Sequence, residues 1–235
     1  MLIIGHRGAG GSFPENTLLS FEKAIKSGVE MIELDVHRSA DGELVVMHDD
    51  KVNRTTDGKG WIRRLTFSQI HQLDAGNGEK IPLLEDVFAL VQGRVKINIE
   101  LKGKNTAGLV AQHIREYRKK YHLPSETVCV SSFDHRQLFR FRENDHETRI
   151  GILYNGRPIK YVQKARLLQA FSVNLSLRAT KPSRIQKIHA QGLQVWVYTV
   201  NTVADLEQMR TWGVDAVFTD FPERLLHHLS IRNSE

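Results

Sequence analysis

Short apolar runs alternate along the chain with segments whose apolar residues recur every three or four positions. The short runs are rich in Val and Ile, which is typical of buried strands, whereas the longer periodic segments are typical of amphipathic helices. We expect strands at residues 1–6, 31–37, 95–101, 127–132, 148–154, 170–175, 194–200 and 215–220. Helices are expected to follow at residues 16–27, 84–92, 106–120, 135–143, 159–168, 181–190, 202–211 and 222–230.

The first helix has clear signals at both of its ends. Asn16 is a residue type that caps a helix, and Leu18, Phe21 and Ile25 fall on one face. Gly28 is suited to end the helix in a left-handed conformation. A helix therefore starts directly after the first strand and a short loop.

The alternation of strands and helices determines the expected fold class. Strands separated by helices form parallel sheets with right-handed crossovers. Eight such units within 235 residues predict an α/β fold, a closed (β/α)8 TIM barrel that forms one domain over residues 1–235. An open, doubly wound sheet is the alternative.

One stretch does not follow this alternation of strands and helices. Asp41-Gly42 is a strong turn signal, so residues 43–48 are expected to pair back on the second strand as an extra strand. The following residues, 49–83, are rich in turns and read as an insertion. Long connections after barrel strands usually lie over the active site, so we predict a small cap subdomain here.

Composition narrows the class of protein. The apolar share of 40% and charged share of 26% are those of a soluble globular protein, and no apolar run is long enough to span a membrane. The start of the chain lacks the pattern of a signal peptide, and Cys129 is the only cysteine, so a cytoplasmic setting is expected. The net charge of +6 favours anionic ligands. The basic residues are scattered, so we expect neither nucleic-acid binding nor a stable membrane association.

Carboxylates stand near the ends of two expected strands that are otherwise built for burial. Glu33 and Asp35 share one face of the second strand, and Glu100 comes near the end of the third. Buried carboxylates are costly unless they are paired or bind a metal. Carboxylates that converge at a barrel mouth suit a hard cation, Mg²⁺ or Ca²⁺. Salt bridges to Arg7 and Lys102 are the structural alternative.

Two histidines also stand at the ends of expected strands, each next to a charged residue. His6 ends the first strand and His48 ends the extra strand, so they are candidates for general acid and general base. His37 is a weaker candidate. Asn16 either caps its helix or helps to bind an anion near the helix N-terminus.

Seven short motifs occur in an order that resembles the glycerophosphodiester phosphodiesterase family. They are "GHRG" at 5–8, "PENT" at 14–17, "ELDV" at 33–36, "DGELVVMHD" at 41–49, "LEDV" at 84–87, "IELK" at 99–102 and "VWVYTVN" at 195–201. Each motif alone is weak, but seven in order are specific. The resemblance extends from residue 3 to about residue 221 and is closest to the compact cytosolic bacterial type.

The resemblance implies a TIM barrel that binds one divalent metal ion and hydrolyses glycerophosphodiesters to glycerol 3-phosphate and an alcohol. Glycerophosphocholine and glycerophosphoethanolamine are substrates of the kind expected. The resemblance assigns a role to each matching residue: His6 and His48 as the catalytic pair, Glu33, Asp35 and Glu100 as metal ligands, Arg7 and Lys102 as phosphate contacts, and Trp196 as a wall of the substrate pocket. Asn16 joins the last group as a substrate-binding candidate. A place in the barrel core is the structural alternative for Trp196.

Two other functions remain open at this point. A lysophospholipase D-like enzyme would use the same residues on lysolipids and would need an apolar rim, for which Trp61, Ile62, Leu65 and Phe67 are candidates. A barrel that only binds a phosphate ligand would lack one of the catalytic residues, and none is missing. The head group, the choice between Mg²⁺ and Ca²⁺, the oligomeric state and the roles of the two histidines are left open.

The sequence offers no serine or cysteine nucleophile beside either histidine. Ser12 is the nearest hydroxyl, and its neighbours do not form a nucleophile elbow. The attacking oxygen then comes from water or from the substrate. The glycerol 2-hydroxyl is well placed for an intramolecular attack that forms a cyclic phosphate, while direct attack by water is the alternative.

Overall fold

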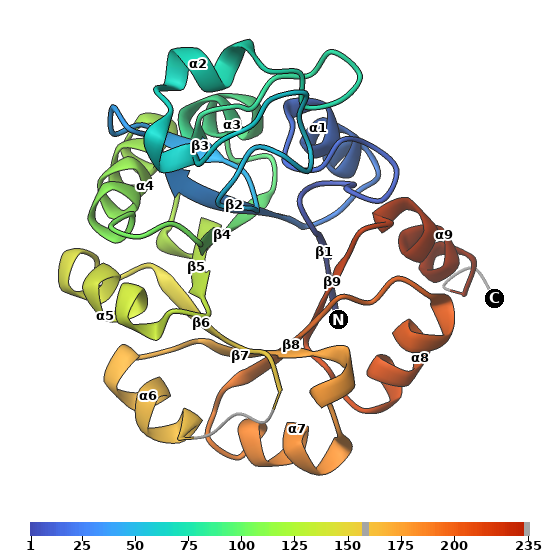
Figure 1. The fold of residues 1–235 in the computed structure, drawn as a ribbon. Coiled ribbons are helices and arrows are strands. Elements are labelled where there is room, and N and C mark those ends of the chain that lie inside the picture. Colours follow the sequence, from blue (N-terminus) through green and yellow to red (C-terminus); the bar gives the residue numbers. More distant parts are fainter. Residues whose placement is uncertain (157–159, 233–235) are drawn as a thin grey trace.

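Eight parallel strands form a closed barrel surrounded by helices (Figure 1) in the computed structural model, which describes residues 1–156 and 160–232. Pairing runs from β1 through β9, β8, β7, β6, β5 and β4 to β2, and β1 also pairs with β2. This last pairing closes the barrel and excludes the open sheet. The strands are β1 (Leu2–Gly5), β2 (Met31–Arg38), β4 (Lys96–Leu101), β5 (Val128–Ser132), β6 (Arg149–Tyr154), β7 (Ser172–Ser176), β8 (Gln194–Tyr198) and β9 (Ala216–Thr219).

The helices on the outside of the barrel follow the expected segments closely. They are α1 (Leu18–Lys26), α3 (Leu84–Val91), α4 (Ala107–Tyr121), α5 (His135–Asn144), α6 (Tyr161–Leu168), α7 (Pro182–His189), α8 (Val203–Thr211) and α9 (Pro222–Arg232). The expected start of the sixth helix, residue 159, lies outside the described residues. Short 3-10 helices span Ile62–Arg64, Ser125–Thr127 and Leu177–Ala179. Among the helices described, none is both long and apolar enough to cross a membrane.

The predicted cap of the first helix is shifted by one residue. Thr17, and not Asn16, is the N-cap of α1, because its side-chain oxygen accepts a hydrogen bond from the Ser20 backbone N–H. Asn16 instead has a left-handed backbone with φ of 59° and is buried. Its side chain is therefore turned away from the helix and towards Asp35 at the barrel mouth.

The main core lies between the barrel and its helices, and a smaller cluster fills the interior of the barrel from its amino-terminal end. This smaller cluster consists of Ile4, Met31, Cys129, Trp196, Ala216 and Phe218. Trp196 lines a small cavity at that end together with Leu2 and Met31, and its indole N–H donates to Gln194. The prediction that Trp196 walls the substrate pocket is therefore wrong.

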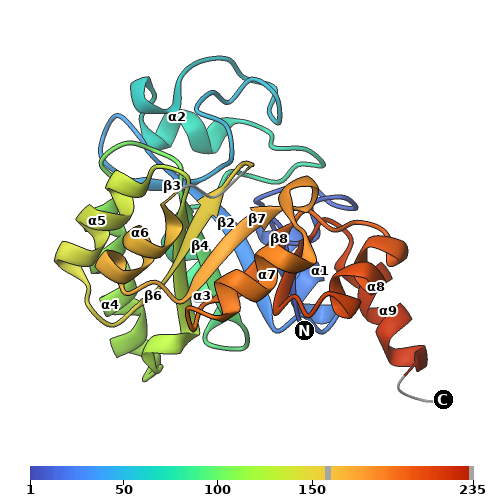
Figure 2. The same ribbon diagram turned by 90° about the horizontal axis from the view of Figure 1, so that it is seen from below.

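The insertion after β2 has an apolar cluster of its own. Strand β3 (Leu44–Val46) pairs antiparallel with β2, as the Asp41-Gly42 turn predicts, and helix α2 (Phe67–Gln72) follows. Figure 2 shows α2 and its loops projecting beyond one end of the barrel. The insertion buries Val45, Met47, Val52, Ile62, Ile70, Ala75 and Ile81. Leu65 and Phe67 pack against this cluster, so these apolar residues form the core of the insertion and not an exposed rim.

Candidate active site

A cavity of about 170 Å³ opens at the carboxyl ends of the barrel strands. One side of the cavity is charged and the opposite side is apolar. The charged side is formed by His6, Arg7, Glu33, His48, Glu100 and Lys102. The apolar side is formed by Phe133, Leu153, Tyr198 and Phe218. A ligand in this cavity would thus meet charges on one side and apolar side chains on the other.

Three buried carboxylates meet at the charged side. Asp35 and Glu100 are direct neighbours across β2 and β4, and Glu33 precedes Asp35 by two residues on the same face. Ligand oxygens of the three lie within 4.8 Å of one another, and each residue is at most 7% exposed. The Arg7 backbone N–H donates to Glu33 Oε2 at 2.9 Å, and Arg7 has a left-handed backbone with φ of 53°. The loop after β1 is therefore bent so that its amide orients a carboxylate.

The charges of these carboxylates oppose one another. Burial, with the adjacent Asp35 charge, raises the pKa of Glu33 to about 7 and that of Glu100 to about 8. Burial would also raise the pKa of Asp35, but the cations of Lys102 and Arg7 outweigh it and hold this pKa below its ordinary value. The site thus has an excess of negative charge that a further cation would relieve.

The donor set fits a divalent metal ion. Three carboxylate oxygens within 4.8 Å of one another are a ligand set that Mg²⁺ and Ca²⁺ favour. Desolvation and mutual repulsion make such a trio costly without a cation, as the raised pKa values of Glu33 and Glu100 indicate. Glu33, Asp35 and Glu100 are therefore the residues of the cavity that could hold a metal ion, whereas a second group of possible ligands, Glu85, His113 and Glu116, lies outside the cavity on α3 and α4.

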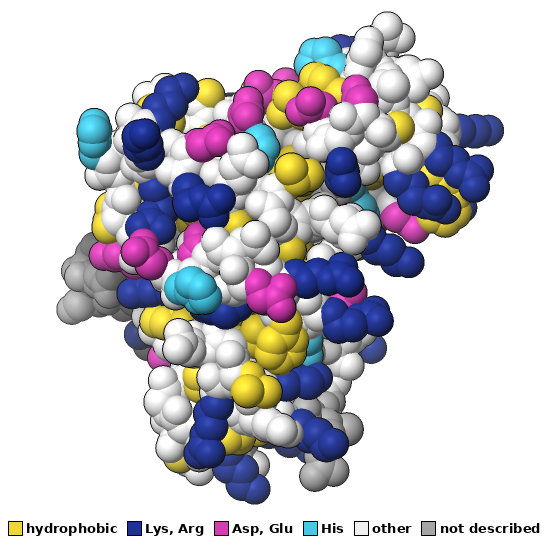
Figure 3. Space-filling model, turned by 90° about the vertical axis from the view of Figure 1, so that its left-hand side faces the viewer, with side chains coloured by type: hydrophobic (Ala, Val, Ile, Leu, Met, Phe, Trp, Pro, Cys, Tyr) yellow, Lys and Arg dark blue, Asp and Glu magenta, His cyan; other side chains and the backbone are white. Residues whose placement is uncertain are grey.

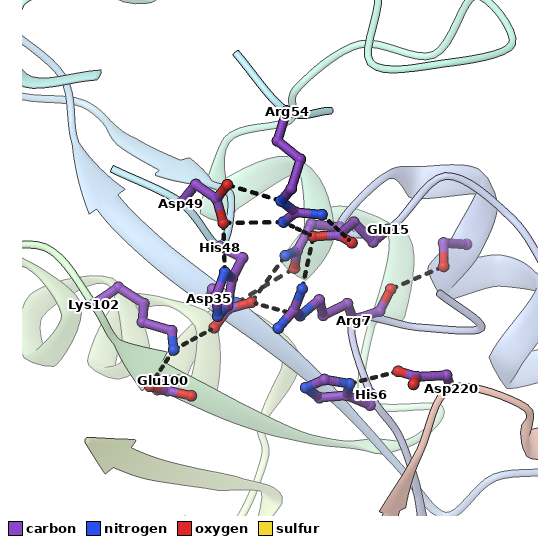
Figure 4. A network of polar contacts seen from close by, with 12 residues as sticks. His6, Arg7, Glu15, Asp35, His48, Asp49, Arg54, Glu100, Lys102 and Asp220 are labelled. Atoms are coloured by element: carbon purple, nitrogen blue, oxygen red, sulfur yellow. Dashed lines mark hydrogen bonds and ion pairs between the residues drawn. The ribbon is translucent and has the colours of Figure 1, made fainter. Parts of the chain in front are cut away.

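Two cations flank the carboxylates (Figure 4). Lys102 Nζ lies 2.8 Å from Glu100 Oε1 and 3.6 Å from Asp35 Oδ1. Arg7 Nε lies 3.4 Å from Asp35 Oδ2. The ion pairs that form the structural alternative are thus present. Because Arg7 and Lys102 also line the cavity, they remain accessible to an anionic ligand.

Each of the two candidate histidines is held by an aspartate. His6 Nδ1 lies 2.6 Å from Asp220 Oδ1, and Asn201 Nδ2 donates to the other oxygen of Asp220. Since a carboxylate only accepts, Nδ1 of His6 carries the proton and Nε2 faces Glu33, 3.9 Å away. His48 Nδ1 lies 2.7 Å from Asp49 Oδ1 in the same manner. Both imidazoles therefore present Nε2 as the free nitrogen.

The two aspartates differ in their own partners. Arg54 binds both oxygens of Asp49, at 2.8 and 3.0 Å, and both oxygens of Glu15, at 2.7 and 3.0 Å. Glu15 in turn accepts from Arg7 Nη1 at 2.8 Å. Figure 4 shows this chain of contacts from Arg7 to His48. Arg54 thus ties the insertion to the loop after β1.

The environments of the two histidines push their pKa values in opposite directions. Burial lowers the pKa of His6, but the hydrogen bond to Asp220 and the Glu33 charge outweigh it and raise this pKa. Burial lowers the pKa of His48, and the charge of Asp35 and the hydrogen bond to Asp49 do not offset it. The neighbours of the two imidazoles are therefore not equivalent.

Asn16 and His37 support the site from behind. Asn16 Nδ2 donates to Asp35 Oδ2 at 2.9 Å, so its amide orients a candidate metal ligand. His37 is buried, and its Nε2 lies 3.0 Å from the His48 backbone oxygen. Neither side chain lines the cavity. Both therefore act on the cavity through Asp35 and His48.

Several site residues were not singled out from the sequence. Asp220 follows a strand, and a position at a strand end is the signal that identified His6. Asp220 and His6 are 214 residues apart in the sequence, however, and they meet only because the barrel closes. Asp49 directly follows His48, yet adjacency does not predict that the side chains bond. Tyr198 lies two residues after Trp196 on the same face of β8, at the mouth instead of the amino-terminal end.

The fold and this site together define a closed α/β barrel with a candidate metal site and two candidate acid–base histidines at its mouth. Comparison with known proteins specifies the class further: residues 6–224 match the model of the glycerophosphoryl diester phosphodiesterase family. The chain belongs to this family, and it is thus a phosphoric diester hydrolase.

Individual relatives cover nearly the whole chain. A glycerophosphodiester phosphodiesterase of Caldanaerobacter subterraneus is 34% identical, over 96% of each sequence. One from Bacillus subtilis is 32% identical, over 95% of this chain and 84% of its own. Among solved structures, an Oleispira antarctica phosphodiesterase in complex with the product sn-glycerol-3-phosphate has a TM-score of 0.90 and 28% identity, covering 98% of this chain and 97% of its own.

Proposed function

We propose that this enzyme hydrolyses glycerophosphodiesters, such as glycerophosphocholine and glycerophosphoethanolamine, to sn-glycerol 3-phosphate and an alcohol. The observation that carries the proposal is the cavity in which a buried carboxylate trio faces two histidines, each held by an aspartate. The product bound to the Oleispira antarctica relative supports the glycerol 3-phosphate part of the substrate.

One divalent ion, Mg²⁺ or Ca²⁺, would be held by Glu33, Asp35 and Glu100. When bound, it would act as a Lewis acid on the phosphoryl oxygens. Arg7 and Lys102 then bind the same phosphate and stabilise the charge that develops on it in the transition state. Asn16 acts by orienting Asp35, and not by touching the substrate.

The apolar side of the cavity receives the glycerol. Phe133 and Tyr198 stand edge to face, with ring centroids 5.8 Å apart, and the Tyr198 hydroxyl donates to the Tyr154 backbone oxygen. These contacts fix the two rings as a rigid wall. Phe133 and Tyr198 thus wall the substrate pocket, the role that the family resemblance implied for Trp196.

His6 is the general acid and His48 the general base. Asp220 is bonded to His6 and to the neutral amide of Asn201, so its charge stabilises the imidazolium form of His6. The charge of Asp49 is shared with Arg54, so it stabilises a cationic His48 less. Groups whose pKa values are pushed apart in this way divide the acid and base roles.

The nucleophile is the glycerol 2-hydroxyl of the substrate. Ser131 lines the cavity, but its oxygen accepts from Asn98 Nδ2 at 3.0 Å, and no hydrogen bond joins it to either histidine. His48 removes the 2-hydroxyl proton, the oxygen attacks phosphorus, and His6 protonates the departing alcohol. Water then opens the cyclic phosphate with the histidine roles reversed, which gives sn-glycerol 3-phosphate.

Residues 49–83 act as a cap that carries Arg54 to the site. Ile62, Leu65 and Phe67 are used in the apolar cluster of the insertion, which does not favour a lysolipid substrate. The cytoplasmic setting stays a prediction, with which Cys129, a buried free thiol, is compatible.

A panel of substrates tests the proposed function. Purified enzyme is given glycerophosphocholine, glycerophosphoethanolamine or lysophosphatidylcholine, with Mg²⁺, Ca²⁺ or EDTA, and release of the head group is measured. We expect release from the two glycerophosphodiesters that depends on the metal. Release from the lysolipid alone would overturn the proposal.

Arg54→Ala is expected to lower kcat roughly tenfold at pH 7, because Asp49 loses a bidentate partner and His48 loses its fixed position. The unshared Asp49 charge should also raise the pKa of His48. The base then stays protonated to higher pH, so the acidic limb of the pH–rate profile should move upward. Arg54→Lys should restore part of the rate. An unchanged profile would argue that Arg54 is only structural.

A further inference from the structure

A second hollow of about 460 Å³ adjoins the reaction cavity, and four of its nine lining residues are cations. It lies between the end of β2, the insertion and the loop after β4. Its basic members are Arg38, Arg63, Lys102 and Lys104, and Asp50 is its one acidic member. We call this hollow the basic groove. Figure 3 shows basic side chains along the flank of the molecule that carries the projecting insertion.

Three of the basic side chains have no acidic partner. Within residues 1–156 and 160–232, no ion pair joins Arg38, Arg63 or Lys104 to a carboxylate, and all three are exposed. Elsewhere on the surface arginines such as Arg94 and Arg118 are paired with glutamates. The groove is therefore a place where positive charge remains available to a ligand.

An aromatic side chain holds part of this charge in place. Arg63 lies over the Trp61 ring, with its guanidinium carbon 5.2 Å from the ring centroid, and Lys51 Nζ is 4.3 Å from the same centroid. Such contacts restrict the long side chains without neutralising them. Trp61 is itself half-buried and lines the groove. The Trp61 ring thus restrains Arg63 on the side of the groove that the insertion forms.

The basic groove and the reaction cavity share Lys102. The reaction cavity, at about 170 Å³, is smaller than the roughly 300–1,000 Å³ typical of sites that enclose a whole ligand. It can enclose the phosphoglycerol part of a diester, and the alcohol part must extend outside it. A substrate whose phosphate contacts Lys102 has the groove directly beside it.

We propose that the basic groove is a subsite for the leaving alcohol, and that it favours glycerophosphodiesters whose alcohol carries a further phosphate. This inference rests on the proposed function and adds a substrate class to it. Arg63 and Lys104 bind the second phosphate from the two sides of the groove, while the scissile phosphate stays beside Lys102 and Arg7. The preference arises in substrate binding, since the second phosphate takes no part in bond cleavage.

Two substrates that differ only in the distal group test the proposal. Glycerophosphoglycerol has an uncharged leaving alcohol, whereas bis(glycerophospho)glycerol has a leaving alcohol that carries a second phosphodiester. In wild-type enzyme we expect the charged substrate to have a roughly tenfold higher kcat/KM, mainly through KM, and salt to reduce this ratio. The double variant Arg63→Ala/Lys104→Ala should bring the ratio close to one and leave glycerophosphoglycerol turnover unchanged.

A matched double variant controls for net charge. Lys119→Ala/Lys120→Ala removes two cations at the far end of α4 and should keep the wild-type ratio. An equal ratio in wild-type and groove variants would overturn the subsite. If wild-type enzyme hydrolyses neither substrate in the presence of metal, the proposed function itself fails, and the two failures are thus distinguishable.

Discussion

Replacing Glu100 with glutamine is expected to abolish divalent-metal binding and to lower kcat roughly a thousandfold. A Lewis acid supplies several kcal/mol to phosphoryl transfer, and each 1.4 kcal/mol is about tenfold in rate. Glu100 is one of three buried carboxylates whose oxygens lie within 4.8 Å of one another, so its loss breaks the ligand set. Asp35→Asn and Glu33→Gln should behave alike, and calorimetry with Mg²⁺ or Ca²⁺ measures the binding.

Stability provides the control for this prediction. The folded-state pKa of Glu100 is raised to about 8, so the metal-free protein loses stability as pH rises through that value. Glutamine mimics the protonated form, so Glu100→Gln in EDTA should unfold at a higher temperature than wild type, increasingly so from pH 5 to 9. Glu143→Gln, at an exposed site on α5, should change neither stability nor metal affinity. Unchanged metal affinity in all three carboxylate variants would place the metal elsewhere.

The second large effect is expected at the histidines. His6→Ala and His48→Ala should each lower kcat between about a hundredfold and ten-thousandfold, the usual range for a general acid or base. Metal affinity should persist in both, because neither histidine belongs to the carboxylate trio. His146→Ala is the matched control, since His146 is exposed and lies outside the cavity and the carboxylate trio.

A substrate with a better leaving group distinguishes the general acid from the general base. A 4-nitrophenyl ester of glycerol 3-phosphate needs little protonation of its departing oxygen, so a variant that lacks the general acid should recover activity on it. We expect recovery for His6→Ala and none for His48→Ala. The reverse pattern would exchange the roles, and recovery of neither variant would contradict the assignment of His6 as a proton donor.

The fold was predictable because its signals are local. Strand and helix bounds follow from the spacing of apolar residues, and the eight-fold alternation leads directly to a barrel. The exception at Asn16 illustrates the limit of such signals, since Asn16 and Thr17 are both good capping residues. Burial of the Asn16 amide against Asp35 decides between them, and this contact depends on β2, not on the sequence around the helix.

The site residues that could be predicted from the sequence are those that stand at the end of an expected strand. The carboxylates and histidines meet in one cavity because the carboxyl ends of parallel strands share one end of the barrel. The partners of these groups required the closed barrel: Asp220 meets His6 only because β9 pairs with β1. The position of Trp196 was predicted wrongly because strand periodicity shows on which face of a strand a residue lies, but not how far along the barrel axis it lies. Tyr198, two residues later on the same face, is the residue that lines the cavity at the mouth.

Phosphorus NMR during turnover of glycerophosphocholine tests whether the reaction passes through a cyclic phosphate and gives sn-glycerol 3-phosphate. With metal present, we expect loss of the diester signal, a transient signal of glycerol cyclic phosphate, and a final signal of sn-glycerol 3-phosphate. His48→Ala should leave the diester signal unchanged over the same period. Accumulation of phosphocholine would mean that the other ester bond is cleaved, and this result would contradict the account.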